Sequence, residues 1–193
     1  QDITVIFRSD ASGPTDNFQL YLEAAAPDAW TGGAGKTFTG GVGEGSRGNE
    51  GVSAAVAQTP GTITYTEWSY AKAEDLGMVR VITPADEEGV ELNADTAGTT
   101  IDSAALVNEG SNDLVIDTTS FYVPQVEGAY PIIMPTYEVV CSSYEDPETA
   151  EAVKSFLNVA VSEEVQDQLE PEGYIPVPDE FREKLLGAIS EIS

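Results

Sequence analysis

Histidine is absent from the chain, and cysteine occurs only once, as Cys141. Without histidine the chain has no Ser–His nucleophilic triad, no histidine-ligated zinc site and no imidazole for acid–base catalysis. A single cysteine excludes an internal disulfide and any metal site built from several thiolates. Cys141 ends the segment at residues 135–141, whose residues are typical of a strand, so we expect a buried small hydrophobic side chain rather than a reactive thiol. The sequence thus predicts no catalytic residue, no metal ligand and no cofactor.

Positive charge and long apolar runs are also scarce. Lys and Arg number 8 against 34 Asp and Glu, which gives a formal net charge of -26. Nucleic acids, DNA or RNA, bind to a basic face, and so do anionic membrane surfaces, so we expect neither as a partner. No apolar run approaches the roughly 20 residues of a membrane span. Because no charged and then apolar leader stands at Gln1, we expect that a targeting segment was removed or that the chain is an excised piece.

The chain has enough hydrophobic residues to form a core, and its predicted strands and helices alternate. Its 193 residues are 41% hydrophobic, which suits one sizeable domain or a lobe with an extension. Apolar patterns predict strands at residues 3–7, 62–65 and 78–82, and extended segments at 120–123 and 130–141. Helical spacing predicts helices at residues 50–58, 68–72, 100–107 and 162–169, and others that begin at Pro147 and near Asp179. The stretch at residues 31–48 holds eight glycines in eighteen residues and is expected to be a loop. This alternation predicts an α/β fold with a mostly parallel sheet flanked by helices.

The strand, loop and helix at the start of the chain form the most informative motif. The apolar strand at residues 3–7 is followed by turn residues at 9–13, and apolar side chains recur at helical spacing from about Thr15. A helix N-terminus therefore lies just past the carboxyl end of a strand, where ligands of open α/β sheets bind. The positive end of the helix dipole and its free N–H groups would meet there.

Arg8, Asp10, Ser12 and Gly13 give this motif the chemistry of a small-oxyanion site. Arg8 ends the strand, and Asp10 is close enough in sequence to hold its guanidinium in one orientation, as bidentate oxyanion recognition requires. Ser12 and Gly13 stand at the helix start, where a hydroxyl and a backbone N–H can donate.

Two other patterns suggest different chemistry. Gly35-Lys36-Thr37 imitates the end of a phosphate-binding P-loop, but Trp30 stands where that pattern needs a glycine. Paired carboxylates could cleave glycosides, yet chance pairs are expected among 34 acidic residues. An acidic hydrolase is therefore kept only as a third hypothesis.

Four segments, in order and spacing, resemble the phosphate-binding proteins of ABC-type phosphate importers, the PstS-type extracytoplasmic receptors. Arg8 to Thr15 is similar to that family's R-x-D-x-S-G-T-T motif. The stretch from Arg47-Gly48-Asn49 to Ala71 resembles K/R-G-N-x-G-V, T-P-G-x-I-G-Y and E-x-x-Y-A in succession. Ala129-Tyr130-Pro131-Ile132 with Tyr137 resembles the crossing between lobes, and residues 173–178 resemble G-Y-x-P-L-P.

The resemblance implies one lobe of a type II periplasmic-binding-protein, or Venus-flytrap, fold and a binding protein rather than an enzyme. Its ligand would be inorganic phosphate, delivered to ABC importer permease subunits at the periplasmic or extracellular face of the cytoplasmic membrane, with a lipid anchor in the full-length protein. By the same resemblance Arg8 would bind phosphate oxygens, Asp10 would pair with Arg8, and Ser12 and Gly13 would donate a hydroxyl and an N–H.

Two departures from the family pattern bear on this site. Pro14 stands where the family has threonine, so an N–H and a hydroxyl are lost unless Thr15 substitutes. The family's N-terminal lobe segment, which holds an Asp that accepts from protonated phosphate, has no counterpart in this chain. We therefore expect residues 1–128 to form the second lobe, and residues 129–193 to form a crossover strand and C-terminal helices returning toward the missing N-terminal lobe. The alternative is an acidic extracellular interaction or sensor domain of the same fold with weakened or lost ligand binding.

Overall fold

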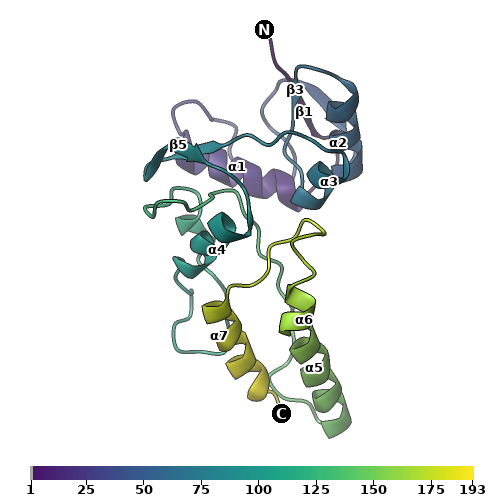
Figure 1. Cartoon of the computed structure of the whole chain (residues 1–193), viewed down its shortest axis with the longest axis vertical. Helices are drawn as coiled ribbons and strands as arrows, with labels where there is room; N and C mark the ends of the chain where they lie inside the picture. Colours follow the sequence, from purple (N-terminus) through teal and green to yellow (C-terminus); the bar gives the residue numbers. More distant parts are fainter. Residues whose placement is uncertain (1) are drawn as a thin grey trace.

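The computed structural model describes residues 2–193 (Figure 1). Its strands are β1 (Thr4–Arg8), β2 (Glu44–Ser46), β3 (Thr62–Ile63), β4 (Val81–Thr83) and β5 (Asp86–Val90). Its α-helices are α1 (Gly13–Ala25), α2 (Gly48–Gln58), α3 (Trp68–Ala73), α4 (Ala94–Asp102), α5 (Pro147–Ala160), α6 (Glu163–Gln166) and α7 (Asp179–Ser190), with one 3-10 turn at Thr118–Ser120.

A parallel sheet in the order β2-β1-β3 carries the first part of the chain. Its central strand β1 follows from the apolar run of the sequence, and Arg8 at its end pairs in register with Ser46 of β2. Helices α1, α2 and α3 surround these strands (Figure 1). The expected α/β class with a parallel sheet flanked by helices is confirmed.

Strand β2 lies inside the glycine-rich stretch that the sequence predicts to be a loop. Its residues Glu-Gly-Ser carry no apolar pattern, so pairing with β1 rather than side-chain burial makes it a strand. Gly43 leads into it at a φ of 89°, and a Cβ there would overlap the carbonyl oxygen of Val5. Only glycine allows this close approach to β1.

Two elements downstream differ from the predicted positions. The predicted strand at 78–82 begins three residues later, as β4, and pairs antiparallel with β5, a strand that includes the acidic cluster Asp86–Glu88. The predicted helix at 100–107 is wrong in position, because α4 begins at Ala94 behind a capping box formed by Asn93 and Thr96. Helices α2, α3, α5 and α7 lie close to where spacing predicts them, whereas α6 is a single turn.

The segments at 120–123 and 130–141 contain no assigned strand. Cys141 is exposed, which contradicts the expectation of a buried side chain. The β-branched run before it resembles a strand, but no neighbour pairs with residues 135–141 in the described chain, and Val139 is 92% exposed.

The apolar core is divided between the two ends of the molecule. Two clusters share Tyr21 and Ile133. One packs α1, the β4–β5 hairpin and the segment around Tyr130 together, and the other adds α4, the segment at residues 116–123 and Phe181 of α7. A separate cluster of Leu157, Val161, Ile189 and Ile192 joins α5 to α7 at the opposite end (Figure 1).

The loop after α6 returns to the first part of the chain. Lys72 Nζ on α3 donates to the carbonyl oxygen of Glu170 (2.7 Å). A Cβ at Gly173 would stand 2.5 Å from the Cα of Ser69, so this loop packs directly on α3. Among residues 2–193, no helix has both the length and the apolar character needed to cross a membrane.

Candidate functional site

The end of β1 and the start of α1 build the centre of the site. Ser12 is the N-cap of α1 in extended conformation, and its Oγ accepts from the backbone N–H of Thr15 (3.0 Å). This is the usual geometry of a serine cap. The positive end of α1 therefore opens at Gly13, a few residues after β1 ends and close to its carboxyl edge.

Arg8 is held from two sides beneath that edge. Its Nε and Nη2 donate to Asp10 Oδ1 (2.9 Å) and Oδ2 (2.7 Å), and its Nη1 donates to Asn49 Oδ1 (2.9 Å). The side chain is only 9% exposed. An arginine has five N–H groups, so one hydrogen on each Nη remains for another acceptor. The guanidinium is thus oriented before any ligand arrives.

Asp10 links this arginine to a second helix. The backbone N–H of Gly48, at the start of α2, donates to Asp10 Oδ1 (3.0 Å). The hydrogen bonds from Arg8 and then from Gly48 hold the pKa of Asp10 far below its usual range, and the bond to Asp10 raises the pKa of Arg8. Both groups therefore stay ionised at any physiological pH. Because the N-cap residue Arg47 makes no side-chain cap bond, Asp10 caps α2 from another loop.

Three hydroxyl groups form a chain beside Arg8. Ser12 Oγ and Thr15 Oγ1 lie 2.6 Å apart, and Thr15 Oγ1 lies 2.7 Å from Tyr65 Oη. Tyr65 Oη also accepts from the backbone N–H of Arg8 (3.2 Å). Thr15 is fully buried, whereas the ring of Tyr65 stacks on Phe18 with centroids 4.7 Å apart.

Buried Gln19 ties the glycine-rich loop to α1. Its Nε2 donates to the carbonyl oxygens of Gly35 (2.7 Å) and Thr37 (3.1 Å), and its Oε1 accepts from the backbone N–H and the hydroxyl of Thr39 (both 2.8 Å). The carbonyl of Lys36, between these anchors, accepts from the N–H of Ser12 (2.9 Å). The loop is therefore part of the support of the helix start.

The first turn of α1 has few donors to offer. Pro14 has no N–H, Thr15 gives its N–H to Ser12 Oγ, and Asp16 gives its own to Ser12 O (3.3 Å). The N–H of Gly13 has no acceptor within the helix, as for any first-turn residue. Gly13 itself is exposed, with Met134 Sδ placed 3.6 Å from where a Cβ would stand.

The structure brings the five predicted site residues into one group and adds three to it. Arg8 and Asp10 form the expected ion pair, and Ser12, Gly13 and Thr15 lie together at the helix start. Tyr65, Asn49 and Gln19 complete the group, and sequence reasoning did not select them. Tyr65 and Asn49 stand in the segments that resemble the receptor family, which is the signal that could have found them.

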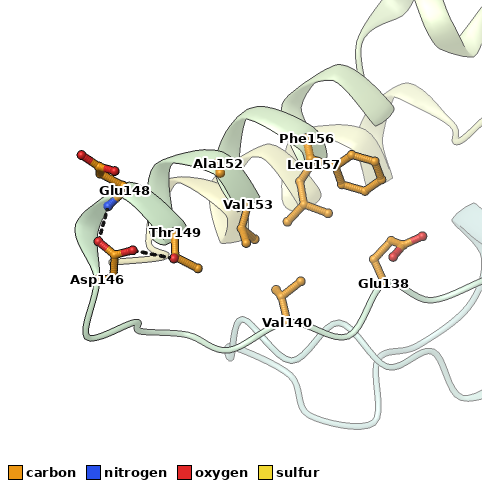
Figure 2. A pocket seen from close by; sticks show the side chains of 9 residues that line it. All are labelled: Glu138, Val140, Asp146, Glu148, Thr149, Ala152, Val153, Phe156 and Leu157. Carbon is orange, nitrogen blue, oxygen red and sulfur yellow. Dashed lines mark hydrogen bonds between the residues drawn. The ribbon is translucent and has the colours of Figure 1, made fainter.

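Two hollows elsewhere are separate from this group. One has a volume of about 510 Å³. In it, Val153 and Leu157 of α5 point toward Val140 of the segment at residues 135–141 (Figure 2). Its rim holds carboxylates, among them Asp146, which caps α5 through the N–H of Glu148 (3.1 Å). The other, of about 460 Å³, lies between α4, α6 and α7 and is lined by acidic side chains and Arg182. Neither contains a donor set for an anion like that around Arg8.

Comparison with known proteins places this geometry in a class. The model of the PBP superfamily domain matches residues 1–164, so the chain belongs to that family. A parallel sheet with an oxyanion-type donor group at its carboxyl edge agrees with this assignment.

Three relatives and two solved structures are informative. The chain is 52% identical over 191 residues to phosphate-binding protein PstS 3 of Mycobacterium tuberculosis, a match that covers 99% of this chain and 51% of the relative. It is 49% identical to PstS 3 of Mycobacterium leprae (100% and 52% covered) and 31% identical to PstS of Methanocaldococcus jannaschii (100% and 52%). The chain thus spans about half the length of these relatives.

The solved structures support the fold. A high-affinity periplasmic phosphate-binding protein, PfluDING, solved with bound phosphate, matches with a TM-score of 0.66 at 21% identity over 96% of this chain and 57% of that protein. A human phosphate binding apolipoprotein matches with a TM-score of 0.63 at 17% identity over 96% and 58%.

Proposed function

We propose that this chain is the ligand-binding part of a receptor for inorganic phosphate, which it delivers to the permease subunits of an ABC importer. The observation that carries the proposal is the preorganised guanidinium of Arg8, fixed by Asp10 and Asn49 and left with one free hydrogen on each Nη. The names of the relatives, which call them phosphate-binding proteins, support the same ligand.

The site residues take different roles in this proposal. Arg8, the N–H of Gly13 and the hydroxyl of Ser12 contact phosphate oxygens. Asp10 acts through Arg8, because both of its carboxylate oxygens already accept hydrogen bonds. Thr15 acts through Ser12, because it has no exposed surface. None of these roles requires bond cleavage, and we propose binding rather than catalysis.

The division of the chain follows the same proposal. Residues 1–128 form most of the lobe that holds the site, and residues 129–193 form a crossover segment and helices that return toward a second lobe. The separate cluster that joins α5 to α7 supports this division. The second lobe would close over phosphate, outside the cytoplasmic membrane, as the word periplasmic in the name of PfluDING suggests.

Calorimetric titration of phosphate into the full-length protein tests the proposal. Arg8→Ala should weaken binding at least about tenfold, because a charge-assisted hydrogen bond contributes roughly 1.5–3 kcal/mol. The matched control is Arg182→Ala. Arg182 also pairs with an aspartate, Asp179 (3.1 Å), and this pair is far from Arg8 in the sequence. Equal affinities of wild type and Arg8→Ala would remove Arg8 from the site.

A second candidate is an acidic extracellular interaction or sensor domain that has lost the ligand. The missing N–H at Pro14 and the exposed apolar side chains Val139, Phe156 and Val159 favour it. Wild-type protein that takes up no phosphate in the same titration would support this candidate and refute the first.

A further inference from the structure

The hydroxyl groups of Tyr65, Thr15 and Ser12 make a chain whose direction can be worked out from its contacts. Three hydroxyls have three hydrogens, and the two short contacts between them use two. One hydrogen must therefore point out of the chain. The hydrogen that is left over decides what the site can offer a ligand.

The middle hydroxyl cannot hold the spare hydrogen. Thr15 is fully buried, and among residues 2–193 its Oγ1 has only Ser12 and Tyr65 as hydrogen-bond partners. A buried donor without an acceptor costs about 1–3 kcal/mol. The hydrogen of Thr15 therefore goes to Ser12 or to Tyr65, and the chain runs in one direction from end to end.

Each end hydroxyl already accepts one backbone N–H, and the difference between a phenol and an alcohol favours the direction from Tyr65 to Ser12. Tyr65 Oη already accepts from the N–H of Arg8 (3.2 Å), and a phenol is a poorer acceptor and a better donor than an aliphatic alcohol because its ring withdraws the oxygen lone pair. Its own hydrogen is therefore best given to Thr15. Ser12 Oγ, an alcohol with two lone pairs, can accept both the N–H and the hydroxyl of Thr15.

We propose that the chain runs from Tyr65 through Thr15 to Ser12, and that Tyr65 is a positioning residue whose hydroxyl polarises the chain and leaves the Ser12 hydrogen for the ligand. This rests on the proposed function, because the outward hydrogen of Ser12 is then aimed at an oxyanion. Ser12 cannot accept in this arrangement, so a P–OH group of the ligand cannot donate to it, and its contact with the ligand is a donation to an oxygen lone pair. Each hydroxyl in such a chain is polarised by the one before it, which strengthens the last donor.

The direction is tested first without any phosphate. Neutron diffraction from crystals of deuterium-exchanged protein should show the deuterium of Tyr65 Oη aimed at Thr15 Oγ1, and that of Thr15 aimed at Ser12 Oγ. A deuterium of Ser12 aimed at Thr15 would overturn the proposal, whatever the ligand of the protein proves to be.

The consequence for binding is tested by a double-mutant cycle of Tyr65→Phe and Ser12→Ala in the protein as its gene encodes it. The phenylalanine ring of the Tyr65→Phe variant keeps the stacking on Phe18, and matching thermal melts would show that the fold is retained. Tyr65→Phe should weaken phosphate binding less than Ser12→Ala does, because Thr15 still donates to Ser12 and only the polarisation of the chain is lost, and Ser12→Ala should then cost less than it does in wild type.

The matched control is Tyr122→Phe, because Tyr122 Oη also hydrogen-bonds α1, at Asn17 Oδ1 (2.9 Å), but lies outside the chain of hydroxyls. Its effect should be additive with Ser12→Ala. Additive effects of Tyr65→Phe and Ser12→Ala would show a merely structural tyrosine and overturn the proposal. Wild-type protein that binds no phosphate would refute the proposed function alone, and the deuterium positions would still decide the direction of the chain.

Discussion

Replacement of Gln19 by Met should be among the most destabilising single changes in this chain. The side chain is fully buried and makes four hydrogen bonds to the glycine-rich loop, two as donor and two as acceptor. Methionine has a similar length and fills the space without making these bonds. At about 0.5–1.5 kcal/mol for each net bond, the loss is roughly 2–6 kcal/mol, a large part of the 5–15 kcal/mol that stabilises a typical domain.

The assay is urea unfolding followed by circular dichroism, with amide hydrogen exchange at Thr39 as the local probe. Exchange at Thr39 should accelerate, because its N–H loses its acceptor. Gln168→Met is the matched control, since its Nε2 makes only one exposed bond, to Glu164 O (2.6 Å). Two variants of equal stability, or unchanged exchange at Thr39, would refute the reasoning that Gln19 holds the loop.

Three further predictions concern the site. Pro14→Thr restores an N–H and a hydroxyl at the first turn of α1. It should tighten phosphate binding by up to about tenfold in a calorimetric titration, at roughly 0.5–1.5 kcal/mol per hydrogen bond. Unchanged or weaker binding would mean that the turn needs no further donor. Because the pKa of Asp10 is lower in the folded than in the unfolded protein, the stability that Asp10 contributes is present above about pH 4 and is lost as pH falls further. The difference in urea midpoint between wild type and Asp10→Asn should therefore narrow below about pH 4. A difference that stays constant would contradict a lowered pKa of Asp10. The 193-residue chain alone should bind phosphate with a dissociation constant of about millimolar or higher, because one lobe leaves the anion partly hydrated. Micromolar binding by the monomer in an NMR titration would show a complete site in this chain.

Local sequence predicted the parts of the site that local structure makes. The apolar run before Arg8 and the serine before a helical pattern placed a guanidinium beside a helix N-terminus, and Asp10 pairs with Arg8 across only two residues. The same logic located α5 behind Asp146 and Pro147. Short-range chemistry of this kind depends on few neighbours.

The rest of the site depends on contacts between distant segments. Asn49 reaches Arg8 across 41 residues, and Tyr65 reaches the N–H of Arg8 across 57. Nothing in the composition of β2 signals a strand, because it exists only through its pairing with β1. The prediction that Cys141 is buried was wrong for the converse reason. Its segment has a strand-like sequence but no pairing partner within the described residues.

An anion site on a chain with a net charge of -26 depends on which hydrogen-bonding groups are left unused, not on net charge. The charge of Arg8 is already balanced by Asp10, so the pair gains orientation at the expense of positive potential. The nearby acceptors are mostly occupied: Asp10 accepts from Arg8 and Gly48, and Asn49 Oδ1 accepts from Arg8 and from the Thr66 hydroxyl (3.3 Å). What remains unused is a set of donors from the guanidinium, the helix start and the end of the hydroxyl chain. A cation finds little beyond the second lone pair of Asp10 Oδ2 among these groups, whereas an oxyanion finds several donors already in place, at little further cost in ordering.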